Sequence, residues 1–183
     1  MDMREEIQIS GGWLKMPEVV ESLETVEQIL RSRPVEDDAD GEAEGAQPTP
    51  QAEWAITYLN GPLEEFFNAL ELDADSLILW FQTLRLLKQQ KRAALYYWRV
   101  YRQRSLPEAL ERIKQVDMLA GERADVLEEL HELRGDLEQI PEPYVHYIDW
   151  ERMANDWVKE GRLFTFFYEG VEWVVLNQPE TEA

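Results

Sequence analysis

The sequence predicts an α+β protein, with strands towards both ends of the chain and helices between them. Residues 53–59 alternate like a strand, and residues 162–176 carry β-branched and aromatic side chains on both arms of an expected hairpin. The middle of the chain has apolar residues at three- and four-residue spacing, which is typical of helices. The 183 residues are 44% hydrophobic and include seven Trp, so the chain can bury a core. This length allows one ordinary domain or two or three very small ones.

The N-terminal segment predicts a strand and a helix. Residues 3–9 form the expected strand, which leads into a Gly-Gly turn. Pro17 then starts the expected helix, whose apolar positions over residues 18–30 follow helical spacing, and Pro34 ends it.

An acidic loop and a second strand follow. Residues 35–51 contain six acids and no aromatic residue, with Gly and Pro throughout. Such a composition cannot offset the entropic cost of ordering, so we expect a flexible loop. After the strand at residues 53–59, Asn60-Gly61-Pro62 predicts a turn and residues 63–72 predict a short amphipathic helix.

The middle of the chain predicts three helices. Asp73 or Asp75 can cap the first of them. The second spans residues 93–104 and is rich in aromatic side chains. The third begins after Ser105, a candidate cap with Glu108 three residues later, as in a capping box.

The C-terminal segment predicts two helices and a β-hairpin. The first helix covers residues 121–140 and ends before Pro141. A short helix over residues 150–161 ends at a glycine, and the hairpin turns at Glu169-Gly170. The apolar stripe of the first helix consists of Val126, Leu127, Leu130, Leu133 and Leu137.

The chain is strongly acidic, with 38 acidic and 18 basic residues and a formal net charge of -20. Most of its surface would repel phosphates, which excludes a general nucleic-acid binder and disfavours anionic membranes. Residues 1–60 hold 14 acidic and 4 basic side chains, residues 61–120 hold 8 and 9, and residues 121–183 hold 16 and 5. The negative charge therefore lies at both ends. Because there is no Cys, no apolar signal core and no membrane-length apolar run, we expect a soluble, cytoplasmic protein.

Signals for catalysis are almost missing. The two histidines, His131 and His146, lie 15 residues apart, and the chain has no Cys to complete a metal site. None of the common catalytic or nucleotide-binding motifs occurs. We therefore expect that the protein is not an enzyme and has no catalytic residue, metal site or cofactor.

The spacing of four acids is more informative. Asp125, Glu129, Glu132 and Asp136 are separated by four, three and four residues, which predicts one helix face opposite the leucine stripe. With a rise of about 1.5 Å per residue, successive carboxylates lie roughly 5–6 Å apart, close to the phosphate spacing of a nucleic-acid strand. Such a row favours either plain solubility or mimicry of a polyanion.

The stretch from Arg85 to Arg104 contains seven Lys or Arg and no acid. Basic residues interleaved with Tyr and Trp can follow a phosphate backbone and stack on bases. The alternative is an amphipathic helix whose Arg stems pack over aromatic rings and whose charges pair with the acidic parts of the chain. The balance of only +1 over residues 61–120 favours this alternative.

The run IPEPYVHYIDWERMANDWVKEGRLFTFFYEGVEWVV resembles the end of the ArdA antirestriction proteins. These typically have Leu/Ile-Pro, then Tyr-Ile-Asp, an aromatic-bearing helix ending in Asp-Leu, and a hairpin that contains Gly. GGWLKMP (residues 11–17) and residues 53–72 resemble earlier family motifs in the same order. Two departures are Tyr58, which replaces a usual acid, and residues 35–51, which resemble an insertion. The matching C-terminal positions are Pro141, Tyr147, Ile148, Asp149, Trp150, Asp156 and Trp157.

The resemblance implies an elongated, homodimeric protein whose acidic surface looks like B-form DNA and occupies the DNA-binding groove of type I restriction-modification enzymes. A groove that neutralises phosphates is basic, so a folded polyanion can compete for it without contacts to base edges. The implied domains are residues 1–74, 75–118 and 119–183. The expected phosphate mimics are Asp125, Glu129, Glu132, Asp136, Glu138, Asp149, Asp156 and Glu160, with Glu18, Glu21, Glu24 and Glu27 at the other end.

Three alternatives stay open at this point. The same mimicry could act on another defence nuclease, such as a CRISPR effector. An acidic adaptor would instead hold a partner protein through exposed aromatic side chains such as Trp98 or Tyr101. A nucleic-acid binder would act through the basic stretch from Arg85 to Arg104.

Overall fold

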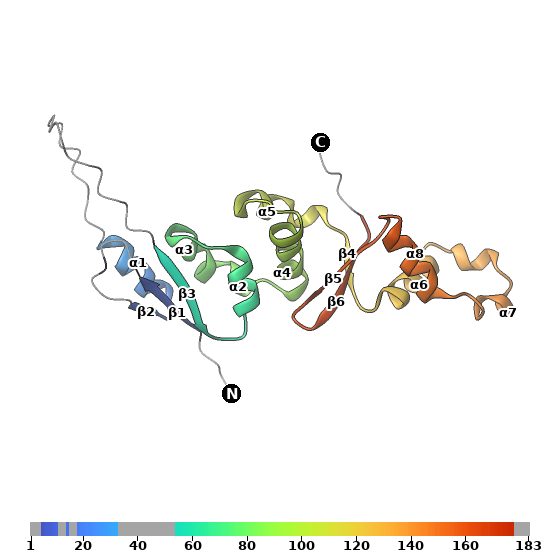
Figure 1. Ribbon diagram of the computed structural model, residues 1–183, viewed down its shortest axis with the longest axis horizontal. Coiled ribbons are helices and arrows are strands. Elements are labelled where there is room, and N and C mark those ends of the chain that lie inside the picture. Colours follow the sequence, from blue (N-terminus) through green and yellow to red (C-terminus); the bar gives the residue numbers. More distant parts are fainter. Residues whose placement is uncertain (1–4, 11–13, 15–17, 33–53, 178–183) are drawn as a thin grey trace, which may run out of the picture. The chain divides into compact units, whose positions relative to one another are not determined.

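The chain combines helices with two small antiparallel sheets, which confirms the predicted α+β class. It divides into two compact units, Met1–Leu87 and Lys88–Ala183 (Figure 1). The three predicted domains stay a prediction, and the predicted loop at residues 35–51 lies outside the described residues. No helix of the described part of the chain is long and apolar enough to cross a membrane. The computed structural model describes residues 5–10, 14, 18–32 and 54–177.

The first unit is built on a three-stranded antiparallel sheet. In spatial order its strands are β2 (Glu18–Val20), β1 (Glu6–Ser10) and β3 (Ala55–Asn60). Ile7 is paired with Val20 on one side and with Tyr58 on the other, and all three side chains are buried. Val19 and Leu59 lie on the opposite face and are exposed. The sheet thus has one core face and one solvent face, as the alternation at residues 53–59 predicts.

The segment before the first helix differs from the prediction. Glu18–Val20 form strand β2, and helix α1 (Leu23–Arg31) begins only after Ser22, whose hydroxyl accepts a hydrogen bond from the Thr25 N–H at 3.4 Å. The prediction of a helix from residue 18 is therefore wrong. Two consecutive β-branched valines pair with β1, and this long-range pairing overrides the local helical spacing.

Two short helices complete the first unit. Asp73 caps the second of them in a capping box with Ser76, whose N–H donates to the Asp73 carboxylate at 2.7 Å. The hydrogen bonds from Ser76 hold the pKa of Asp73 below its ordinary value. Of the two predicted caps, Asp73 is the one used. The elements are α2 (Glu64–Leu70), α3 (Ala74–Gln82) and the 3₁₀ turn η1 (Leu84–Leu86).

Tyr58 lies at the centre of the core of this unit. The centroid of its ring is 5.0 Å from that of Phe67 and 6.3 Å from that of Trp80, and its hydroxyl accepts a hydrogen bond from the Leu63 N–H at 3.3 Å. Burial raises the pKa of Tyr58 to about 12, so the phenol stays neutral. The residue that departs from the family pattern is thus a core residue here.

The second unit begins with helices and ends with a sheet. Ser105 and Glu108 form the predicted capping box, because the Ser105 N–H donates to the Glu108 carboxylate at 3.0 Å. The helical elements are α4 (Gln89–Tyr96), its π-helical continuation η2 (Tyr97–Tyr101), α5 (Leu106–Arg112), η3 (Ile113–Gln115), α6 (Arg123–Leu133), η4 (Asp136–Gln139), α7 (Glu142–Val145) and α8 (Trp150–Lys159).

The sheet of the second unit contains the predicted hairpin. Glu169 and Gly170 form its turn with φ of 50° and 73°, the left-handed pair that suits a two-residue hairpin connection. A third, unpredicted strand pairs with the hairpin. In spatial order the strands are β4 (Met118–Ala120), β6 (Val171–Val175) and β5 (Phe164–Tyr168).

Helices contact both faces of this sheet. On one face, Tyr96 and Tyr97 pack against Phe166, with ring centroids 6.2 and 5.9 Å away. On the other face, Val174 forms a buried cluster with Val126 of α6 and Leu163. The cluster includes side chains of α8 at its edge. The sheet is therefore the core around which the second unit is organised.

Two further expectations are wrong. Helix α6 ends at Leu133, seven residues before its predicted end, because Gly135 adopts a left-handed conformation with φ 72°. Trp98 was expected on the surface, but its side chain is only 1% exposed and its indole N–H donates to the Arg112 carbonyl at 2.9 Å. Tyr101 is 43% exposed, as expected. The adaptor hypothesis thus loses one of its two named aromatic residues.

The turn at Gly61 gives a test of the first unit. Gly61 has φ 143°, and a Cβ atom there would collide with the Tyr58 hydroxyl. We predict that Gly61→Ala lowers the free energy of unfolding by about 1–3 kcal/mol, through backbone strain and displacement of Tyr58. Urea unfolding followed by Trp fluorescence measures this loss. Gly161→Ala is the matched control, since nothing lies within 4 Å of its added Cβ. A Gly61→Ala variant no less stable than this control would contradict the prediction.

Candidate functional site

Helix α6 presents an exposed acidic row. Asp125, Glu129 and Glu132 are exposed, whereas Val126 and Leu127 are buried and anchor the helix to the core. Steps of four and three residues place the three carboxylates on one helix face, roughly 5–6 Å apart along the axis. Three of the four predicted members of the row therefore lie together on a helix held in place by its apolar side.

Asp136 does not continue this row, contrary to the prediction. It follows the left-handed Gly135 and begins η4 instead of extending α6. Its carboxylate lies 2.8 Å from Nδ1 of His131. The His131 ring lies against Trp150 and Trp157, with centroids 5.6 and 5.4 Å away. Asp136 therefore ties the η4 turn to α6, and we call Asp125, Glu129 and Glu132 the acidic row from here on.

The other predicted acids of the second unit occupy varied positions. Asp149 caps α8 by accepting a hydrogen bond from the Arg152 N–H at 2.9 Å. Asp156 lies 3.1 Å from Lys159, and Glu160 lies 3.8 Å from Arg162. Both ion pairs are at least half exposed, and such pairs contribute only about 0–1 kcal/mol. A cation from a partner can therefore replace the Lys or the Arg at little cost. Glu138, in η4, is exposed.

The four predicted acids of the first unit do not share one helix. Glu18 lies in β2 and Glu21 precedes α1, because the helix starts later than predicted. Glu24 lies in the first turn of α1, and Glu27 lies 3.0 Å from Arg31 one turn later. Glu18, Glu21 and Glu24 are exposed.

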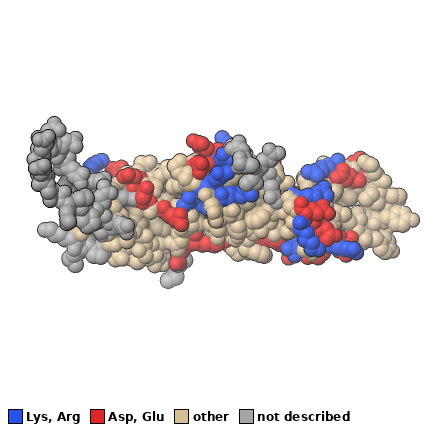
Figure 2. Space-filling view, turned by 45° about the horizontal axis from the view of Figure 1, so that its top comes forward, with Lys and Arg blue, Asp and Glu red and all other residues tan. Residues whose placement is uncertain are grey.

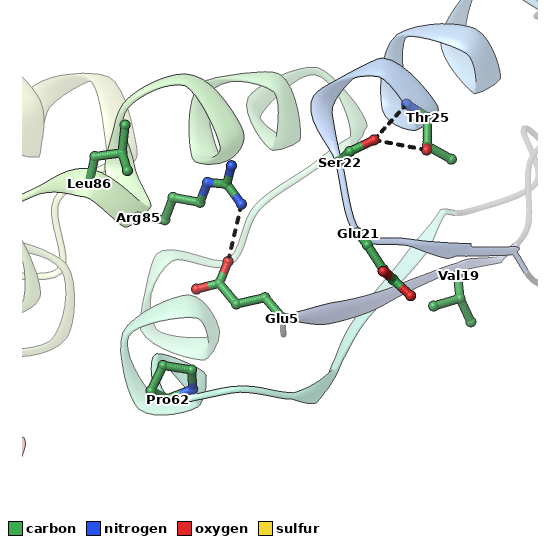
Figure 3. A pocket seen from close by; sticks show the side chains of 8 residues that line it. All are labelled: Glu5, Val19, Glu21, Ser22, Thr25, Pro62, Arg85 and Leu86. Atoms are coloured by element: carbon green, nitrogen blue, oxygen red, sulfur yellow. Dashed lines mark hydrogen bonds and ion pairs between the residues drawn. The ribbon is translucent and has the colours of Figure 1, made fainter. Parts of the chain in front are cut away.

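A cavity of about 680 Å³ lies next to α1 in the first unit (Figure 3). Glu21 and Glu5 contribute carboxylates to its lining and Arg85 contributes a guanidinium. Nη1 of Arg85 lies 3.6 Å from Oε2 of Glu5, and the guanidinium lies over the Phe81 ring at 4.8 Å. The first cation of the basic stretch is thus engaged within the fold.

Arg92 is engaged even more closely in the second unit. Its Nε and Nη2 atoms donate to the two carboxylate oxygens of Glu169 at 3.0 and 2.8 Å, and the Tyr168 hydroxyl donates to the same carboxylate at 2.8 Å. Burial disfavours the charged guanidinium, but the hydrogen bonds and charges of Glu169 and Tyr168 together outweigh it and raise the pKa of Arg92. Burial and the bond to Glu169 also raise the pKa of Tyr168. The ion pair between Arg92 and Glu169 joins α4 to the hairpin turn.

Two further contacts, in and just beyond the basic stretch, are also internal. The Arg112 guanidinium, just beyond the stretch, lies 5.7 Å from the centroid of the buried Trp98 ring. Arg99 donates to the Arg104 carbonyl at 2.6 Å. These contacts support the alternative in which Arg side chains pack over aromatic rings and pair with acids, rather than a nucleic-acid binding surface.

Comparison with known proteins decides the family. A family model described as antirestriction protein (ArdA) matches residues 5–172. The chain belongs to the ArdA antirestriction family. No curated protein and no solved structure matches it. Members of the ArdA family are DNA mimics that inhibit type I restriction enzymes, and they are not enzymes themselves. The match confirms the resemblance drawn from the C-terminal run and the function that it implied.

The contact between Arg92 and Glu169 gives a test of this ArdA protein. We predict that Arg92→Ala lowers the free energy of unfolding by about 2 kcal/mol or more, because it leaves a half-buried Glu169 carboxylate without its cation. Arg92→Lys restores little of this loss, since an ammonium cannot reproduce the two-pronged contact. Thermal unfolding of both variants measures the effect. Lys91→Ala, one residue earlier and exposed, is the control. Equal losses in Lys91→Ala and Arg92→Ala would contradict the prediction.

Proposed function

We propose that this chain inhibits a type I restriction-modification enzyme by placing the acidic row of α6 in the groove that binds DNA. The observation that carries the proposal is that the row is exposed on a helix whose other side is buried in the core. The spacings between its charges are therefore fixed before binding, and no structural rearrangement is needed to form them. Such preorganised charges compete for a phosphate-binding groove at low entropic cost.

The other predicted acids extend this surface in the same proposal. On the face shown in Figure 2, Asp and Glu side chains lie among Lys and Arg in the part of the second unit that carries α6 and α8. The weak ion pairs there exchange their cations for those of the enzyme as it binds. The cytoplasm, where restriction enzymes meet incoming DNA, is the place of action. The additional acids are Glu138, Asp149, Asp156 and Glu160, with Asp136 beside them and Glu18, Glu21, Glu24 and Glu27 in the first unit.

The acidic row gives the first functional test. We predict that neutralising Asp125, Glu129 and Glu132 to Asn or Gln abolishes relief of restriction of unmodified phage by a type I system. In vitro, the salt dependence of binding to the purified enzyme falls by about one counterion for each acid removed.

The control variant removes the same number of negative charges as the row variant, but at positions outside the acidic row. Glu64→Gln, Asp75→Asn and Glu111→Gln together remove three exposed acids from other elements. This variant keeps clearly more inhibition than the row variant. Asp136→Asn alone also costs less than Glu132→Gln, because Asp136 already faces His131. Equal loss in the row variant and the control would show that only total charge matters and would refute the assigned surface.

We also propose that the protein is a homodimer that associates through exposed apolar and aromatic side chains of its second unit. Tyr144 and Tyr147 are 63% and 84% exposed, and Leu133 at the end of α6 is 75% exposed. On the face shown in Figure 2, the part of the second unit beyond α6 and α8 displays no Lys, Arg, Asp or Glu. Aromatic side chains are enriched in protein interfaces relative to the rest of the surface.

Mass measurement in solution tests the dimer. We predict that the wild-type chain sediments at twice its 21.6 kDa mass and that Tyr144→Ser with Tyr147→Ser shifts it to the monomer. Leu86→Ser is the control, since Leu86 is as exposed but lies in the first unit. A wild-type protein that stays monomeric at micromolar concentration, or a double variant that stays dimeric, would overturn this interface.

A further inference from the structure

A small groove lies at the turn end of the second sheet. It has a volume of about 450 Å³, within the range of ordinary ligand sites, and is lined by the β5–β6 hairpin and by the first turns of α6 and α8. None of its lining residues was among the expected phosphate mimics. Its lining includes Phe167, Glu172, Glu122, Arg123 and Glu151.

Strand register places an aromatic ring beside a carboxylate in this groove. Phe167 of β5 is paired directly with Glu172 of β6, so their side chains lie on the same face of the sheet. Val174 lies on this face too, where it packs against α6. The Phe167 side chain is 66% exposed, although the first turn of α6 lines the same groove. The groove therefore presents an exposed aromatic ring next to a carboxylate.

The groove is negatively charged beyond what its own cation neutralises. Arg123 lies 3.2 Å from Glu151 and 4.0 Å from Glu172, and Glu122 adds a third, exposed carboxylate next to it. Three carboxylates against one guanidinium leave a net charge of -2. An anion would be repelled here, and an apolar side chain would strip water from the carboxylates without replacing their hydrogen bonds.

We propose that this groove receives an arginine side chain from the basic groove of the restriction enzyme, an inference that rests on the proposed function. A guanidinium satisfies both features at once, because its flat face stacks on an aromatic ring while its N–H groups donate to carboxylates. Phe167 supplies the ring, and Glu122 supplies the carboxylate of the lining that does not pair with Arg123. Arg123 holds Glu151 and Glu172 in place on either side.

A small probe tests the groove without any enzyme. N-acetyl-arginine amide is titrated into the ¹⁵N-labelled full chain, and amide chemical shifts are followed by NMR. We expect saturable shifts confined to residues 121–123, 151, 167 and 170–172. These shifts disappear in Phe167→Ala and shrink in Glu122→Gln, while Glu111→Gln, an exposed acid on α5, keeps them. N-acetyl-glutamine amide, which is uncharged, gives none. No shift, or shifts spread over the whole acidic surface, would overturn the site.

Binding to a purified type I enzyme tests the partner. We expect Phe167→Ala to weaken binding about fivefold at constant net charge, the effect of losing one cation–π contact. Leu86→Ala is the control, because it shortens a similarly exposed apolar side chain in the first unit. If Phe167→Ala binds as tightly as the wild type, the enzyme does not use the groove and the proposal fails. If the wild type itself binds no type I enzyme, the proposed function fails, and the probe titration still decides whether the groove binds arginine.

Discussion

The contact between Arg92 and Glu169 fixes the arrangement of the second unit. It joins α4 to the turn of the β5–β6 hairpin and so holds the tyrosines of α4 and its continuation against one face of the sheet. Helices α6 and α8 then pack on the other face, where Val174 meets Val126. The acidic row of α6 consequently points to solvent, where its charges remain hydrated. The position of the proposed binding surface thus depends on an ion pair that is not part of it.

The cost of removing a carboxylate from water separates the acids that stabilise the fold from those available to a partner. Glu5, Glu169 and Glu172 have side chains less than 20% exposed, and each has an arginine within 4.0 Å. A half-buried carboxylate needs such a partner because desolvation is costly. The acidic row is exposed and needs none. A chain with 18 basic residues against 38 acids can therefore neutralise its buried acids and still present an excess of negative charge.

Local signals in the sequence predicted local structure well. The hairpin turn at Glu169-Gly170 and the capping box at Ser105 depend on residues a few positions apart, and both were predicted correctly. The failures depend on distant contacts. Strand β2 forms because β1 is there to pair with it, and Trp98 is buried by residues that spacing alone does not place. At the candidate site, the row was predicted to run to Asp136 but continues only to Glu132, because Gly135 was not recognised as the end of the helix. The groove at Phe167 was missed entirely because strand register and helix ends create it together.

A polyanion alone would bind every basic groove in the cell, so charge cannot account for the choice of one enzyme. The attraction between exposed charges is long-ranged and mainly raises the association rate, and salt screens it. Selectivity requires contacts that depend on shape and fail on the wrong surface. In this chain the groove at Phe167, with its aromatic ring and its carboxylates, lies in the same unit as the acidic row. An enzyme with an arginine in the matching position gains a short-range contact there, whereas a basic surface without one gains only the screened attraction of the row. In the proposed mechanism, the acidic row therefore captures the enzyme and the groove recognises it.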